Sequence, residues 1–183
     1  IEKEISPGNF SAVGTAPVFG NYANYTDVAA NVQVQTNSYR SRYIDTCGTV
    51  GSASNVATTV LCQGIGVQEV QINSLNWTPY VGFDVGVDHY EIFRIDPSGN
   101  LNFLASLPAG RYTYDDSVQL GDFPGKVCYY VEAHEVPNNY GFQEACKSNE
   151  ICILYPPIIY IHNSIVPDGI NQVFKPVAIT VDT

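Results

Sequence analysis

Short runs of alternating apolar and polar residues, most of them followed by a turn signal, recur along the middle of this chain. A period of two puts every second side chain on one face of a strand, so each run suits a strand with one buried face. The clearest turn is Asp96-Pro97-Ser98-Gly99-Asn100, between two of the runs. The pattern predicts an all-β chain folded as an antiparallel sandwich, with strands at residues 70–77, 89–95, 101–107, 112–114, 127–135 and 151–154.

The composition of the 183 residues favours a folded chain and disfavours nucleic acid as a partner. Hydrophobic residues make up 45% of the sequence and charged residues only 14%, which indicates a buried core rather than disorder. Lys and Arg number 8 against 18 Asp and Glu, and the net charge of −10 repels phosphate backbones. No stretch reaches the roughly 18 apolar residues of a membrane-spanning helix. We therefore expect no transmembrane segment in this chain.

Five cysteines are many for this length, and they lack the C-x-x-C pairs of a zinc site. Cys128 begins one predicted strand and Cys152 lies near the end of another. If these strands form an antiparallel hairpin, the two sulfur atoms meet, and a disulfide would indicate an oxidising compartment. Cys47, Cys62 and Cys146 then remain, an odd number. The alternative is five reduced thiols that act as small hydrophobic residues.

The order of the runs in residues 64–155 resembles a fibronectin type III domain. The segment LNWTPY at residues 75–80 is similar to the second strand of that family, with Trp77 as its core tryptophan. The resemblance implies one complete fibronectin type III-like domain over residues 64–155. Three further segments are similar to the third strand, the sixth strand and the entry to the last strand, namely DHYEIFRI at 88–95, CYYVEAHE at 128–135 and Ser148-Asn149-Glu150.

The first third of the chain repeats this pattern at an offset of about 90 residues. Residues 1–63 are therefore predicted to form a partial fibronectin type III-like domain that starts within its third strand, in tandem with the complete one. A sandwich without its first two strands exposes an apolar sheet face. We expect further chain upstream or a partner to cover that face, unless the domain is a degenerate one in a short natural protein. The matches are Tyr25-Thr26-Asp27 with Tyr114-Asp115-Asp116, Tyr39 with Tyr129, and Ser54-Asn55 with Ser148-Asn149.

The last residues, from 159 to 177, carry a motif after the stiff Pro156-Pro157 linker. They resemble the opening of the type B, gliding-motility-associated C-terminal sorting domain of proteins exported by the type IX secretion system of Bacteroidetes. Residues 156–183 would then be a linker and the truncated start of such a domain. A plain Pro-Asp-Gly turn is the alternative. The residues that carry the motif are Asn163, Pro167, Asp168, Gly169, Ile170, Asn171, Val173 and Phe174.

This resemblance implies a secreted or cell-surface protein on the extracellular side of the outer membrane. Its partners would be the outer-membrane translocon and the shuttle or attachment proteins that act with it. The sandwiches would serve as spacer or adhesion modules that bind surface glycans or proteins. The competing hypotheses are a carbohydrate-binding accessory module of a secreted glycoside hydrolase, and a subunit of a surface assembly completed by strand exchange.

The sequence predicts no catalytic residue and no cofactor. His89, His134 and His162 lie on separate predicted strands or their edges, and a catalytic pair would need a carboxylate or nucleophile brought near one of them. No G-x-S-x-G elbow is present. Asp115, Asp116 and Asp122 are a weak calcium candidate, because no twelve-residue loop pattern surrounds them. Most tyrosines are expected in the core or half-buried on strands, with Tyr80, Tyr130 and Tyr140 as the candidates for an exposed, ligand-binding subset.

Overall fold

The structure is a computed structural model that describes residues 1–20, 22–96, 98–119, 125–138, 141 and 143–155, and the backbone of 158–160 and 177–179. These residues form antiparallel strands and turns and include no helix, so the predicted all-β class is correct. Within the same residues, no helix is long and apolar enough to span a membrane.

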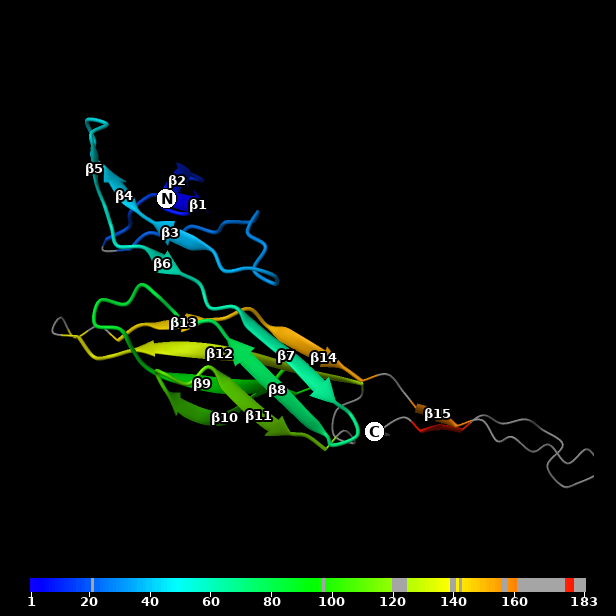
Figure 1. Cartoon of the computed structure of the whole chain (residues 1–183). Coiled ribbons are helices and arrows are strands. Elements are labelled where there is room, and N and C mark those ends of the chain that lie inside the picture. Colours follow the sequence, from blue (N-terminus) through cyan, green and yellow to red (C-terminus); the bar gives the residue numbers. More distant parts are fainter. Residues whose placement is uncertain are drawn as a thin grey trace, which may run out of the picture.

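Residues 60–155 form a β-sandwich of two antiparallel sheets (Figure 1). The larger sheet has the order β10-β9-β12-β13, with β14 also paired to β12, and the smaller sheet has the order β11-β8-β7. The strands are β7 (Cys62–Val67), β8 (Ile72–Trp77), β9 (Val87–Ile95), β10 (Leu101–Pro108), β11 (Thr113–Ser117), β12 (Lys126–Glu135), β13 (Ala145–Lys147) and β14 (Ile151–Leu154).

The core lies between the two sheets because alternate residues of the long strands face inward. In β12, four residues two positions apart have no exposed surface at all, as the alternating sequence requires. Trp77 at the end of β8 is 4% exposed and packs on Tyr90 of β9, with ring centroids 5.7 Å apart. The four inward residues of β12 are Val127, Tyr129, Val131 and Ala133.

Strand β7 has two glycines where it passes close to β14. A Cβ atom on Gly66 would stand 2.5 Å from the Tyr155 hydroxyl and 2.6 Å from Ile153 Cγ2. A Cβ atom on Gly64 would stand 2.9 Å from a methyl of Leu75. The absence of side chains at these positions lets β7 close one side of the core. The domain boundary that the sequence places between residues 63 and 64 falls inside β7, because this strand begins at Cys62.

Residues 1–59, called the N-terminal unit below, form a separate small sheet with the order β2-β1-β3-β6 and a hairpin of β4 and β5 (Figure 1). Asn37 is the one buried residue among those described in this unit. The described residues of this unit therefore form no hydrophobic core of their own. Its strands are β1 (Glu2–Ser6), β2 (Asn9–Ala12), β3 (Ser38–Arg40), β4 (Arg42–Ile44), β5 (Val50–Ala53) and β6 (Ala57–Thr58).

A cation, a carboxylate and a tyrosine hydroxyl meet in the same way in both units, an arrangement called the repeated triad below. In each case a cross-strand neighbour of the tyrosine supplies the cation, and one carboxylate oxygen accepts from both partners. The oxygen-to-donor distances are 2.9 and 2.8 Å in the N-terminal unit and 3.0 and 2.7 Å in the sandwich. The triads are Lys3, Asp27 and Tyr39, and Arg94, Asp116 and Tyr129.

A serine hydroxyl makes the same two hydrogen bonds in both units, and in the sandwich this serine lies at the entry to the last strand. The Ser54 hydroxyl accepts from the backbone N–H of Ser41 and donates to the carbonyl of Asn55. The Ser148 hydroxyl accepts from the N–H of Val131 and donates to the carbonyl of Asn149. The same hydrogen bonds therefore occur in both units, at equivalent positions about 90 residues apart.

The N-terminal unit joins the sandwich through a few polar contacts. The backbone N–H of Thr58 donates to the carbonyl of Val81 at 2.7 Å. The Asn55 amide donates to the carbonyl of Gly82 at 2.6 Å, beside the same loop. These contacts anchor the unit at the end of the sandwich that carries loop 78–86.

At the other end of the sequence, β15 (Ile158–Tyr160) pairs with β16 (Val177–Ile179) in an antiparallel hairpin. Residues 161–176 come between these two strands in the sequence and are outside the described residues. All the predicted sorting-motif residues lie there, namely Asn163, Pro167, Asp168, Gly169, Ile170, Asn171, Val173 and Phe174.

Candidate functional site

A hollow of the sandwich, called the loop-end hollow below, lies at the end that carries residues 78–86, 136–138 and 143–144. Its volume is about 690 Å³, and residue Asn55 of the N-terminal unit forms part of its wall. The backbone N–H of Val136 donates to the carbonyl of Gly86 at 3.1 Å and ties the two loops together. Loops held by a rigid sandwich commonly carry recognition sites.

Two aromatic rings form the apolar part of the loop-end hollow. Tyr80 and Phe83 lie with ring centroids 4.2 Å apart and planes tilted by 45°. The backbone N–H of Tyr80 donates to the hydroxyl of the buried Tyr90, which fixes the loop to the core. Burial first, and then nearby Cys146, Glu135 and Glu144, raise the pKa of Tyr80 to about 12. Its hydroxyl therefore keeps its proton at neutral pH and remains a hydrogen-bond donor.

Three carboxylates give the loop-end hollow its polar part. Glu135 ends β12, is 4% exposed, and accepts from the backbone N–H of Glu144 at 3.4 Å and from the Asn138 amide at 3.4 Å. Asp84 and Glu144 lie in the same wall. Aromatic faces beside carboxylate and amide groups are suited to a polyhydroxylated ligand, whose C–H face stacks on a ring while its hydroxyls donate to oxygen atoms.

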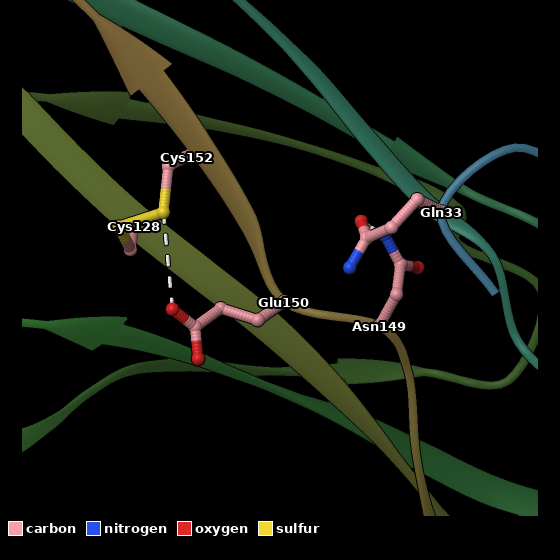
Figure 2. The surroundings of a disulfide bond; sticks show 5 residues. All are labelled: Gln33, Cys128, Asn149, Glu150 and Cys152. Carbon is pink, nitrogen blue, oxygen red and sulfur yellow. Dashed lines mark hydrogen bonds between the residues drawn. A yellow bond between two sulfur atoms is a disulfide. The ribbon is translucent and has the colours of Figure 1, made fainter. Parts of the chain in front are cut away.

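The Cys128–Cys152 disulfide connects the two strands from which the sequence inferred it (Figure 2). Cys128 on β12 lies directly opposite Cys152 on β14 in the antiparallel register. The Glu150 carboxylate lies 3.8 Å from the Cys152 sulfur. A disulfide sulfur carries no proton, so this is a packing contact, and the oxidised sulfurs are poor metal ligands.

The other three cysteines are free thiols: Cys47 is exposed, Cys62 is buried and Cys146 is partly buried. Burial raises the pKa of Cys62 to about 12 and also raises the pKa of Cys146. Both thiols are therefore protonated and weakly nucleophilic at neutral pH. Reactive-cysteine chemistry has no support at these two positions.

Asn149, part of the motif that marks the entry to the last strand, has an identifiable structural role, and Figure 2 shows it beside Gln33. Its side chain accepts from the N–H of Cys62 at 2.7 Å and donates to the carbonyl of the same residue at 3.0 Å. It also donates to the Gln33 amide oxygen at 3.2 Å. One side chain thus binds an end of β7 to the last strand and also contacts the N-terminal unit.

The calcium candidate does not assemble in the described residues. Asp116 is buried, and the Arg94 guanidinium and the Tyr129 hydroxyl bind its carboxylate. Asp115 is exposed, because neighbouring residues of β11 face opposite sides of their sheet. Asp122 lies outside the described residues. The two adjacent aspartates therefore cannot ligate one ion together.

The histidines and tyrosines that the sequence singled out fall in different places. His89 and His134 lie on the outer face of the larger sheet, opposite one another and beside a carboxylate, a juxtaposition that sequence reasoning missed. The expectation of an exposed Tyr130 is wrong: it is 2% exposed, because Phe93 stacks on it and the Lys147 ammonium lies over its ring. Tyr140 and His162 are outside the described residues.

Comparison of the chain with protein-family models, with curated proteins and with solved structures finds no match.

Proposed function

We propose that this chain belongs to a protein exported to the cell surface, in which two fibronectin type III-like units act as spacer or adhesion modules. The observation that carries the proposal is the disulfide between Cys128 and Cys152, because such bonds persist in oxidising, extracellular surroundings. The fibronectin-like character is supported by the arrangement of a three-stranded sheet with a larger sheet in one sandwich. It is also supported by the buried Trp77 and by the repeated triad. The work proposed is recognition and spacing, without a catalytic residue.

The export route proposed is the type IX secretion system, with the outer-membrane translocon and its shuttle or attachment proteins as partners. Support for this step comes from the sequence of the tail, where Pro167-Asp168-Gly169 and Phe174 resemble the sorting-domain opening. The hairpin of β15 and β16 agrees with a β-structured segment at these positions. Export by this route would place the protein on the extracellular side of the outer membrane.

The export proposal is tested by fusing a reporter to the complete C-terminal region that begins with this chain. In Bacteroidetes cells with an intact type IX system the reporter should reach the surface, and in cells without the translocon it should stay inside. Combined Asp168→Ala, Gly169→Ala and Phe174→Ala substitutions should also retain it. The Cys47→Ala variant is the matched control. Retention of the unchanged fusion in competent cells would refute the proposal.

The second candidate function is carbohydrate binding, as in an accessory module of a secreted glycoside hydrolase. The loop-end hollow favours it, because the Tyr80 and Phe83 rings lie beside carboxylates and amides. The folded chain should bind members of a glycan array, and Phe83→Ala should abolish the binding. Tyr43→Ala, at an exposed tyrosine that is not among the residues lining the hollow, should leave it unchanged. Equal binding by both variants would exclude the hollow as the glycan site.

A further inference from the structure

Four side chains form a compact array on the outer face of the larger sheet, away from the core. β9 and β12 are antiparallel neighbours, and their register sets His89 opposite His134 and Glu91 opposite Glu132. Residues two apart on a strand share a face, so all four project from the same surface. Each side chain is partly exposed, which leaves the array open to solvent on one side.

The imidazole nitrogens of this array converge on one carboxylate. The two rings stack with centroids 4.7 Å apart and planes within 2° of parallel. Glu91 Oε1 lies 3.6 Å from Nε2 of His89, and Glu91 Oε2 lies 3.3 Å from Nε2 of His134. Glu132 Oε2 lies 3.7 Å from the same His134 nitrogen. Potential ligand atoms of His89, Glu91 and His134 all lie within 4.8 Å of one another.

A fifth residue fixes where the proton of His89 lies. Asp88 Oδ2 is 2.8 Å from Nδ1 of His89. An ionised carboxylate can only accept, so Nδ1 must donate, and in the neutral ring Nε2 then carries the lone pair. That nitrogen lies 3.6 Å from Oε1 of Glu91. Two acceptors are thus close together, an arrangement that a positive centre between them would stabilise.

His134 supplies an independent observation for the same centre. Its Nε2 atom is almost fully shielded from solvent and makes no hydrogen bond with the residues that the structure describes. Glu91 and Glu132 also face each other directly, and like charges opposite one another destabilise a sheet. Lys147 lies opposite Glu132 in the register, yet its ammonium lies over the Tyr130 ring, 3.6 Å from the ring centroid.

We infer that His89, Glu91 and His134, with Glu132 beside them, form a binding site for a zinc-class divalent transition-metal ion. Two imidazoles and a carboxylate are ligands that Zn²⁺ prefers, whereas Ca²⁺ and Mg²⁺ select sites made of oxygen atoms. Glu132 or water fills the fourth position. The Asp88 carboxylate orients His89 from behind, as outer carboxylates do for histidine ligands of zinc.

Side-chain rotation would bring the array around the ion, because the two imidazole planes, now parallel, must tilt before both Nε2 lone pairs point at one atom. Bonds of about 2.0–2.2 Å in a tetrahedral site place neighbouring ligand atoms about 3.4 Å apart. The separations of 3.3 and 3.6 Å between Glu91 and the two imidazoles already match that spacing. The backbone positions need not move, because the strand register sets both pairs opposite each other.

The test is calorimetric titration of the whole, chelator-treated chain with ZnCl₂, in a Cys47→Ser, Cys146→Ser background that removes accessible thiols. About one Zn²⁺ per chain should bind, Asp88→Ala should weaken binding about tenfold, and His134→Ala and His89→Ala should weaken it more. Glu144→Gln, a carboxylate in the loop-end hollow, is the matched control and should bind like the parent chain. CaCl₂ should give no heat of binding.

Two further measurements separate ligation from folding. In thermal denaturation, Zn²⁺ should raise the melting temperature of the parent chain. The histidine variants should be folded, but Zn²⁺ should not raise their melting temperature. The ¹⁵N shifts of the His89 and His134 rings should change at Nε2 when Zn²⁺ is added. Absence of Zn²⁺ binding, or binding that survives both histidine substitutions, would overturn the inference and leave the array an ion-pair network.

Discussion

At the scale of single residues, the repeated triad shows how one carboxylate organises each unit. The Lys3 ammonium first, and then the Tyr39 hydroxyl, hold the pKa of Asp27 below its ordinary value of 3.8. The same contacts, with the Asp27 hydrogen bond as the largest cause, raise the pKa of Lys3. In the sandwich the equivalent Asp116 is buried against Tyr129, whose pKa is raised mainly by burial.

The depressed pKa of Asp27 predicts acid sensitivity in the N-terminal unit. A carboxyl whose pKa is lower in the folded state adds stability above its unfolded value, and this stability is lost as the pH falls through the folded pKa. The loss should therefore occur below about pH 4. Replacing Lys3 by Met should move the pKa of Asp27 upward, which an NMR titration of the side-chain carboxyl carbons measures.

The matched control for this titration is Lys126→Met, at an exposed lysine of the sandwich. It should leave the titration of Asp27 unchanged. An Asp27 pKa that stays the same in Lys3→Met would mean that the Lys3–Asp27 ion pair at 2.9 Å is not formed in solution.

Sequence reasoning found the residues whose role depends on local pattern and missed those that depend on register. The buried Trp77 follows from the resemblance of residues 75–80 to a fibronectin type III strand, and the Cys128–Cys152 pair follows from the expected hairpin. The meeting of His89 with His134 does not, because a shift of one residue between β9 and β12 would turn one of them to the other face. That register is set by the packing of the whole core.

At the scale of elements, β7 shows why a strand can escape detection. Its sequence CQGIGV has glycines at two inward positions, and glycine lowers strand propensity and removes the apolar alternation. The structure needs those positions empty because Ile153 and Tyr155 occupy the space. By contrast, β12 was predicted almost to its ends, since its inward residues are uninterrupted and apolar.

Gly66→Ala should therefore destabilise the sandwich. The added methyl would stand 2.6 Å from Ile153 Cγ2, and forcing such overpacking apart costs about 1–3 kcal/mol. Urea denaturation followed by Trp77 fluorescence measures the change. Gly110→Ala is the control, because a Cβ atom there meets nothing within 4 Å and its backbone is not left-handed. Equal midpoints for the two variants would show that β7 and β14 do not approach so closely.

The disulfide between β12 and β14 should stabilise the sandwich measurably. Its cysteines are 24 residues apart, and closing a loop of that length restricts the unfolded chain by about 3 kcal/mol. Replacing Cys128 and Cys152 together by Ala should lower the free energy of unfolding by about that amount, as measured by urea denaturation. Cys47→Ala should not change it. A double variant as stable as the parent would contradict the assigned role of the bond.

At the scale of the whole molecule, burial divides the chain unequally. The hydrophobic core lies in the sandwich, whereas Asn37 alone is buried among the described residues 1–59. Local stability follows the density of buried contacts. Amide hydrogen exchange should therefore be slow in β8, β9 and β12 and much faster in β1, β3 and β6, as measured by mass spectrometry or NMR.

The protection of backbone amides from hydrogen exchange in the N-terminal unit also tests whether another molecule packs on this unit. If a second copy completes its sheet by strand exchange, protection of residues 1–59 should rise with protein concentration. Protection equal to that of β12 at every concentration would contradict the uneven distribution of stability.

The covalent link between β12 and β14 also decides how the chain responds to traction. A pull applied beyond Tyr155 reaches Cys152, crosses the sulfur–sulfur bond and continues from Cys128 back along the chain toward β11. Residues 129–151 lie inside the closed covalent ring and carry none of that tension. Most of β12, the whole of β13 and the Glu132–His134 segment would keep their shape while neighbouring strands were drawn out. Reduction of the bond would open the ring and make the same residues extensible.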